Sequence, residues 1–112
     1  MRKLKGKRLR IYMSETDKIE HTPLYEWILK QADKAKMIGA TAIRGIEGFG
    51  SRHHMHSNKI LRLSLNLPII VEINDVPGKI ESFLKTIEPN IGDARLTLEN
   101  IEIIVAAGKM EE

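Results

Sequence analysis

A segment rich in glycine, arginine and histidine, residues 44–56 (RGIEGFGSRHHMH), holds the side chains best suited to binding chemistry. Its glycines let the backbone turn and approach a ligand closely, because they carry no Cβ. Its arginines and histidines offer hydrogen-bond donors to an anion or nitrogen ligands to a metal. The sequence therefore predicts a binding site here, and the candidate ligand-binding residues are Arg44, Gly45, Gly48, Phe49, Gly50, Arg52 and His56.

Two explanations of the glycines and arginines stay open. The glycines would form a backbone nest whose N–H groups face a phosphate, or they would relieve strain at a bulged hairpin corner. Arg44 and Arg52 are suited to bidentate recognition of phosphate or carboxylate. The alternative for Arg44, which lies among apolar residues, is a salt bridge between subunits. Phe49 would stack on a base or fill a hydrophobic gap at a subunit boundary.

The three histidines of the segment raise the question of a metal. A metal site needs three or four converging ligands. On an extended segment His54 and His56 point the same way, whereas His53 points to the opposite side. We therefore assign no metal and keep His54 and His56 as weak candidates, which would converge only if two histidines from each of three subunits met on a symmetry axis.

Composition narrows the functional class. The 112 residues suffice for one domain, 42% of them are hydrophobic, and none is cysteine. No catalytic motif of the GxSxG or HExxH type is present, so we do not expect an enzyme. No apolar run approaches a membrane span or a signal peptide, so we expect a cytoplasmic protein without membrane insertion.

The first ten residues carry six positive charges, and residues 1–6 are expected to form a basic N-terminal arm. Such an arm would bind nucleic acid, or it would be a frayed terminus leading into an edge strand that the charges keep from pairing with other chains. The interleaved aromatic residues of a single-strand binding surface are missing. A nucleic-acid partner is therefore not expected.

The elements that must position the site follow from hydrophobic periodicity. Alternation predicts strands over residues 7–13, 40–46, 69–74, 94–98 and 101–105, with a further apolar piece at 60–65. Helical spacing predicts a helix over 23–38, with Thr22 as N-cap and Gly39 as stop, and a second helix after Asp75 as cap and Pro77 in the first turn.

This order predicts an α+β, ferredoxin-like βαββαβ domain, a four-stranded antiparallel sheet with two helices on one face. Residues 47–66 form the loop between the second and third strands, and residues 107–112 a mobile tail. Leu61, Leu63, Ile70 and the C-terminal Ile and Val residues leave apolar surface on the other sheet face. We expect a second copy of the chain to cover it.

Residues 39–75, GATAIRGIEGFGSRHHMHSNKILRLSLNLPIIVEIND, resemble the signature region of the domain of unknown function 190 family. The resemblance rests on Arg44-Gly45, Gly48-Phe49-Gly50, His56 and Leu67-Pro68, and it extends over nearly the whole chain. That family is similar in fold to the PII nitrogen-regulatory signalling proteins. Unlike PII proteins, the chain has no recognisable glycine-rich phosphate loop in residues 88–92.

The resemblance implies a homotrimer with its sheets facing inward and ligand clefts between subunits. It also implies a regulatory or sensor role, in which an adenine nucleotide binds in the clefts and a loop is presented to a protein target, a transporter or an enzyme. No other cofactor is assigned. The alternatives are a metal-binding trimer that uses the loop histidines and a basic nucleic-acid-associated module.

Overall fold

The computed structural model describes residues 1–49, 55–57 and 66–106, with the backbone alone at 55–57. The elements are β1 (Arg2–Ser14), β2 (Lys18–Ile19), β3 (Thr22–Pro23), α1 (Leu24–Lys34), β4 (Gly39–Arg44), β5 (Glu47–Phe49), β6 (Met55–Ser57), β7 (Pro68–Asp75), α2 (Pro77–Ile87), a 3-10 turn (Glu88–Asn90) and β8 (Arg95–Val105). The expected tail 107–112 and the apolar piece 60–65 lie outside the described residues.

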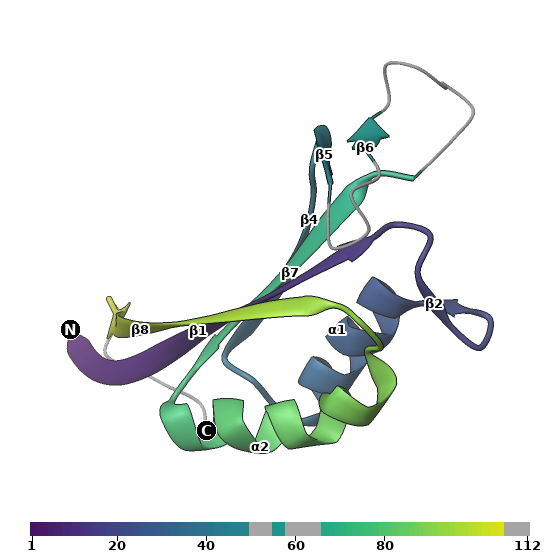
Figure 1. The fold of residues 1–112 in the computed structure, drawn as a ribbon. Coiled ribbons are helices and arrows are strands. Elements are labelled where there is room, and N and C mark those ends of the chain that lie inside the picture. Colours follow the sequence, from purple (N-terminus) through teal and green to yellow (C-terminus); the bar gives the residue numbers. More distant parts are fainter. Residues whose placement is uncertain (50–54, 58–65, 107–112) are drawn as a thin grey trace.

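Four strands form one antiparallel sheet in the order β4–β7–β1–β8. Both helices lie on the same face of this twisted sheet (Figure 1). The predicted ferredoxin-like arrangement is therefore confirmed, with β1, β4, β7 and β8 as its four strands. Within the described residues, no helix has both the length and the apolar character needed to cross a membrane.

The core lies between the sheet and the helices because the central strands alternate in polarity. Leu9 pairs with Ile73 and Ile11 with Val71, and all four are fully buried. The helices contribute apolar residues at helical spacing to the same cluster. These residues are Leu24, Ile28 and Ala32 from α1, and Ile80, Phe83 and Ile87 from α2.

Helix α1 is shorter than expected at both ends. It begins at Leu24, because the preceding Thr22–Pro23 pairs with Lys18–Ile19 as strand β3. It ends at Lys34, because Lys36 adopts a left-handed conformation with φ 58°. The Lys36 and Met37 amides donate to the carbonyls of Asp33 and Ala32, both at 3.1 Å, which closes the helix. The prediction that Gly39 stops the helix is wrong, since Gly39 begins β4.

Asp75 is also placed differently from the expectation, because Val76 is the N-cap residue of α2. The Asp75 carboxylate instead accepts hydrogen bonds from the Ile38 amide at 2.8 Å and from the Val76 amide at 2.6 Å. Asp75 is 1% exposed. It therefore joins the connection before β4 to the connection before α2.

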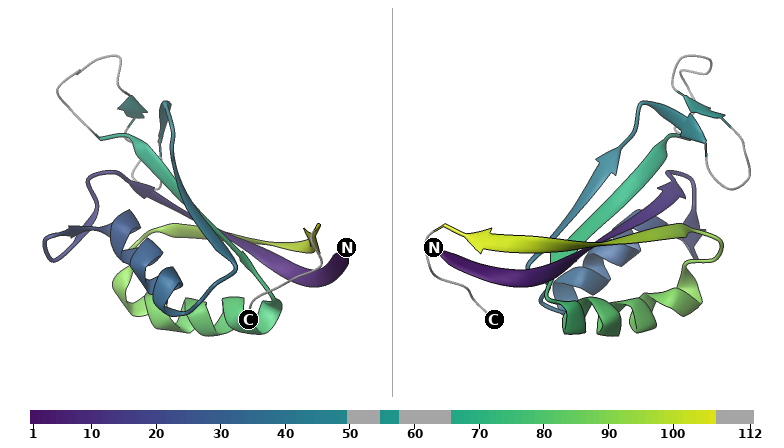
Figure 2. Two further views of the ribbon diagram at one scale, coloured as in Figure 1. Left: turned by 180° about the vertical axis from the view of Figure 1, so that it is seen from behind. Right: turned by 60° about the vertical axis from the view of Figure 1, so that its left-hand side comes forward.

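The basic N-terminal segment belongs to the sheet and is not a separate arm. Residues 2–6 continue β1 and pair with residues 101–105 of β8, which is one continuous strand rather than two pieces. The pairing of β1 with β7 ends at Lys7, so beyond it β1 and β8 form a two-stranded ribbon (Figure 2). Where β7 and β8 both pair with β1, β1 is a central strand. It is therefore not the edge strand that one explanation of the basic residues required.

Candidate functional site

An ion pair joins two strand ends on the side of the sheet nearest the glycine-rich segment. Arg44 is the last residue of β4, and Glu15 follows β1 directly. The Arg44 Nη2 donates to Glu15 Oε2 at 2.5 Å. The Arg44 side chain is 56% exposed and that of Glu15 only 10%. The guanidinium is thus anchored at Nη2 on a side chain that is more than half exposed, and its partner is in the same chain.

The Glu15 carboxylate is incompletely satisfied. Its Oε1 is buried and has no hydrogen-bond partner within the part of the chain that the structure describes. A buried acceptor without a donor costs about 1–3 kcal/mol. The Glu15 backbone amide, by contrast, donates to the Leu67 carbonyl at 2.7 Å, so the main chain at this position is fixed.

Side-chain oxygens of the β1–β2 turn cluster next to Glu15. The Ser14 hydroxyl forms a short hydrogen bond to Asn66 Oδ1, and the Thr16 hydroxyl donates to the same oxygen at 3.1 Å. Asp17 Oδ2 accepts from the Ser14 amide at 3.0 Å. The sequence predicted no role for this turn. Its run of Ser, Glu, Thr and Asp after an alternating strand was the available signal.

The glycines at the site are needed for close packing rather than for a left-handed backbone. The Gly45 amide donates to the Pro68 carbonyl at 2.7 Å, and a Cβ on Gly45 would lie 2.8 Å from Pro68 Cγ. A Cβ on Gly48 would make an ordinary contact at 3.6 Å. Among the described glycines only Gly92 has a positive φ. Gly45 thus permits the chain after β4 to approach the start of β7.

A short hairpin leaves the sheet after Gly45. Strands β5 and β6 pair in antiparallel fashion, with Gly48 opposite His56 and Phe49 opposite Met55. The hairpin lies beyond the end of β4 and β7, away from the N-terminus (Figure 1). Ile46, before the hairpin, is 79% exposed, and Phe49, at the end of β5 away from the sheet, is 61% exposed, so both ends of β5 carry apolar side chains in contact with solvent.

The structure brings together part of the predicted site. Arg44, Gly45 and Gly48 lie at the base of the hairpin, and His56 is placed by its backbone only. Gly50, Arg52, His53 and His54 lie outside the described residues. Within the described residues, no three His, Cys, Asp or Glu side chains converge as metal ligands. The metal hypothesis therefore depends on histidine side chains that the structure does not describe.

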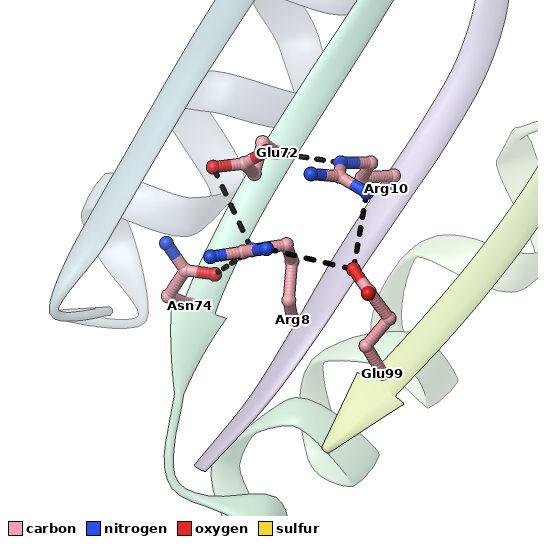
Figure 3. Close-up of polar contacts among 5 residues, drawn as sticks. All are labelled: Arg8, Arg10, Glu72, Asn74 and Glu99. Atoms are coloured by element: carbon pink, nitrogen blue, oxygen red, sulfur yellow. Dashed lines mark hydrogen bonds and ion pairs between the residues drawn. The ribbon is translucent and has the colours of Figure 1, made fainter. Parts of the chain in front are cut away.

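A second charged cluster lies on the sheet face opposite the helices (Figure 3). Arg10 contacts Glu72 at 3.0 Å and Glu99 at 3.0 Å, while Arg8 contacts the same two carboxylates at 3.8 and 3.5 Å. Asn74 accepts a hydrogen bond from Arg8 at 3.3 Å. The hydrogen bond to Glu72 raises the pKa of Arg10, despite an opposing contribution from desolvation.

This outer-face cluster changes the expectation of an apolar outer sheet face. The centre of the face is charged and internally compensated by two arginines and two glutamates. Apolar side chains lie on both sides of it in the sheet register. They are Tyr12, Ile70 and Ile43 in one row towards the hairpin, and Leu4, Ile101 and Ile103 towards the ribbon.

A concave surface of about 590 Å³ lies between the two helices. Met37, Val76 and Phe83 give it an apolar lining, and Lys34 and Lys79 contribute the cationic groups. It shares no residue with the Glu15–Arg44 pair. Lys79 is already engaged, because its Nζ donates to the Lys36 carbonyl at 2.6 Å.

Residues 6–103 match the model of the DUF190 family, described as Uncharacterized ACR. A UPF0166 protein from Aquifex aeolicus is 38% identical over 104 residues, which cover 93% of this chain and 98% of the relative. A UPF0166 protein from Methanocaldococcus jannaschii is 40% identical over 81 residues, covering 72% and 74%.

The chain also resembles solved structures at low sequence identity. CPII from Thiomonas intermedia K12, a nitrogen regulatory PII-like protein bound to ADP, AMP and bicarbonate, matches with a TM-score of 0.66. The sequence identity is 17%, and the alignment covers 91% of each chain. At this identity the likeness establishes the fold alone.

Proposed function

Because the chain belongs to the DUF190 family and has a PII-like fold, we propose that it is a regulatory protein that binds a small anionic ligand, an adenine nucleotide, beside Arg44. The proposed site includes Gly45, Gly48 and Phe49, together with Gly50, Arg52 and His56 of the same segment. The protein acts by binding and not by catalysis.

The observation that carries the proposal is the arrangement of Arg44. Its guanidinium is held at one nitrogen by Glu15, and the side chain is more than half exposed at the base of the hairpin. Within the described residues, no other acceptor contacts this guanidinium. Arginine recognises phosphate through two parallel N–H groups, and the Glu15 contact occupies only Nη2 of Arg44 among the described residues.

The fold likeness supports the choice of ligand. The PII-like protein CPII binds ADP, AMP and bicarbonate, which are all anions. Phe49, 61% exposed next to Gly48, is an aromatic side chain of the kind that packs against an adenine base. Together these features favour a nucleotide over an inorganic anion alone.

We assign the complete site to a homotrimer in which the outer sheet faces meet. The apolar rows on either side of the outer-face cluster are the surfaces that would be buried. The ligand binds between subunits, and the target, a transporter or an enzyme, binds the loop 47–66. Binding of the one affects binding of the other if both discriminate between the same two states of the protein.

The test is titration of the purified chain with ADP, AMP and ATP by calorimetry and thermal shift. We expect binding and a rise in melting temperature for at least one nucleotide. Arg44→Ala should weaken binding by about 10- to 100-fold, as for a lost hydrogen bond to a charged group. Lys30→Ala removes one positive charge from an exposed position on α1 and should leave affinity unchanged.

Two results would contradict the proposal. No response to any adenine nucleotide at millimolar concentration would exclude the ligand class. A monomer mass in light scattering would exclude a site shared between subunits.

A further inference from the structure

We infer that Glu15 is a positioning residue for ligand binding, which holds the Arg44 guanidinium in its binding orientation before the ligand arrives. The inference rests on the proposed function, because it concerns the same site. Glu15 would not itself contact the anion. Its effect on affinity passes through Arg44.

Among the described residues, the Glu15 side chain has no polar partner other than Arg44. One carboxylate oxygen bonds to Arg44 at 2.5 Å, and the other is buried without a hydrogen-bond donor within the described residues. Asp75 shows the contrasting arrangement, since both of its oxygens accept backbone amides and tie two connections together. A carboxylate that only supported the fold would be expected to resemble Asp75.

The backbone at Glu15 and the backbone directly after Arg44 both bond to the dipeptide Leu67-Pro68. The Glu15 amide donates to the Leu67 carbonyl, and the Gly45 amide, directly after Arg44, donates to the Pro68 carbonyl, each at 2.7 Å. The backbones that carry Glu15 and Arg44 are therefore fixed relative to each other. The ion pair completes this geometry at the level of the side chains.

Ordering a long side chain such as that of Arg44 costs conformational entropy. An exposed arginine samples many rotamers. A ligand that immobilises the side chain binds more weakly, because the lost conformational entropy is subtracted from its binding free energy. Glu15 restricts Arg44 in advance, while the Arg44 side chain stays more than half exposed. The negative charge of Glu15 acts in the opposite direction, because it repels an anionic ligand. A comparison that separates orientation from charge must therefore hold the charge constant.

Glu15→Gln and Glu15→Met provide that comparison. Both lack the charge and are close to glutamate in length, but only glutamine retains an oxygen that can accept from Arg44. The probes are ADP and inorganic pyrophosphate, titrated calorimetrically into the full chain. We expect Glu15→Gln to bind about tenfold more tightly than Glu15→Met, corresponding to the immobilisation of one arginine. In an Arg44→Ala background the two variants should bind equally.

The outcomes distinguish a failure of the role inferred for Glu15 from a failure of the proposed function. Equal affinities of the Gln and Met variants, with the wild type binding normally, would overturn this inference alone. A tenfold difference that persists in the Arg44→Ala background would also overturn it, because Glu15 would then act without Arg44. No binding of any adenine nucleotide or of pyrophosphate by the wild type would overturn the proposed function as well.

A second measurement does not depend on how the variants fold. Nitrogen relaxation of the arginine Nε–H groups in the ligand-free wild type reports side-chain order on the picosecond to nanosecond timescale. We expect the Arg44 group to be ordered and that of the exposed Arg2 to be mobile. Equal mobility of the two groups would overturn the inference.

Discussion

Replacement of Asp75 by alanine should destabilise the fold more than any other single carboxylate change among the described residues. Asp75 is almost completely buried at the end of β7, and it accepts the Ile38 and Val76 amides. The truncation removes both acceptors and leaves two backbone donors unsatisfied. It therefore detaches the α1–β4 connection from the start of α2.

The magnitude follows from those two hydrogen bonds. An unsatisfied buried donor costs about 1–3 kcal/mol, and bonds to a charged acceptor lie in the upper part of the range. Ile38 is partly exposed, so water can replace part of what is lost there. We expect Asp75→Ala to lower the free energy of unfolding by about 2–4 kcal/mol, a large part of the 5–15 kcal/mol typical of a domain. Asp75→Asn keeps one acceptor and should lose about half as much.

Urea unfolding followed by circular dichroism measures the change, at one fixed protein concentration because association would shift the midpoint. Hydrogen exchange should show faster exchange of the Ile38 and Val76 amides in the alanine variant. Asp93→Ala, at an exposed position, is the matched control and should change stability by less than about 0.5 kcal/mol. Equal stability of Asp75→Ala and the control would refute the reasoning, as would an Asn variant as unstable as the Ala variant.

Three further substitutions test other features. Gly45→Ala would place a methyl group 2.8 Å from Pro68 Cγ and should lower the free energy of unfolding, measured in urea, by about 1–3 kcal/mol. Gly48→Ala, with an ordinary contact, should lower it far less, and equal losses would contradict the packing argument. Gly78→Ala, in the first turn of α2 with open space at its Cβ, should raise the melting temperature by an amount equivalent to about 0.5–1 kcal/mol, and a lowered melting temperature would contradict it. Glu72→Gln leaves the two arginines of the outer-face cluster with one carboxylate. If the chain associates through this face as proposed, its oligomers should dissociate more readily at low salt than at high salt in sedimentation experiments. Salt-independent association would argue against that interface.

The architecture was largely predictable because the strands alternate strictly. Leu9 and Ile11 lie on the helix side and Arg8 and Arg10 on the other, as the period of two requires. The end of α1 was not predictable by the usual rule, since a lysine takes the left-handed position that glycine normally occupies.

The site was only partly predictable for a different reason. Arg44 and Gly45 could be singled out by residue type alone. The partner of Arg44, Glu15, lies 29 residues earlier, after a strand that is not a neighbour of β4 in the sheet. Side-chain periodicity gives the face on which a residue lies and carries no information on which strand ends meet. The outer-face cluster was missed on the same grounds, because its arginines and glutamates come from three strands.

The pairing of β1 with β8 has a consequence for how the chain folds. Arg2 lies opposite Val105, so β1, which is synthesised before β8, finds one of its two neighbours only after β8 has been made. Contacts between such distant segments require closure of a long loop, and they slow folding relative to proteins of local contacts. Until then the β8-facing edge of β1 has unpaired backbone groups, and its lysines and arginines disfavour pairing with other nascent chains. The basic residues of β1 therefore disfavour wrong pairing while the sheet is still incomplete.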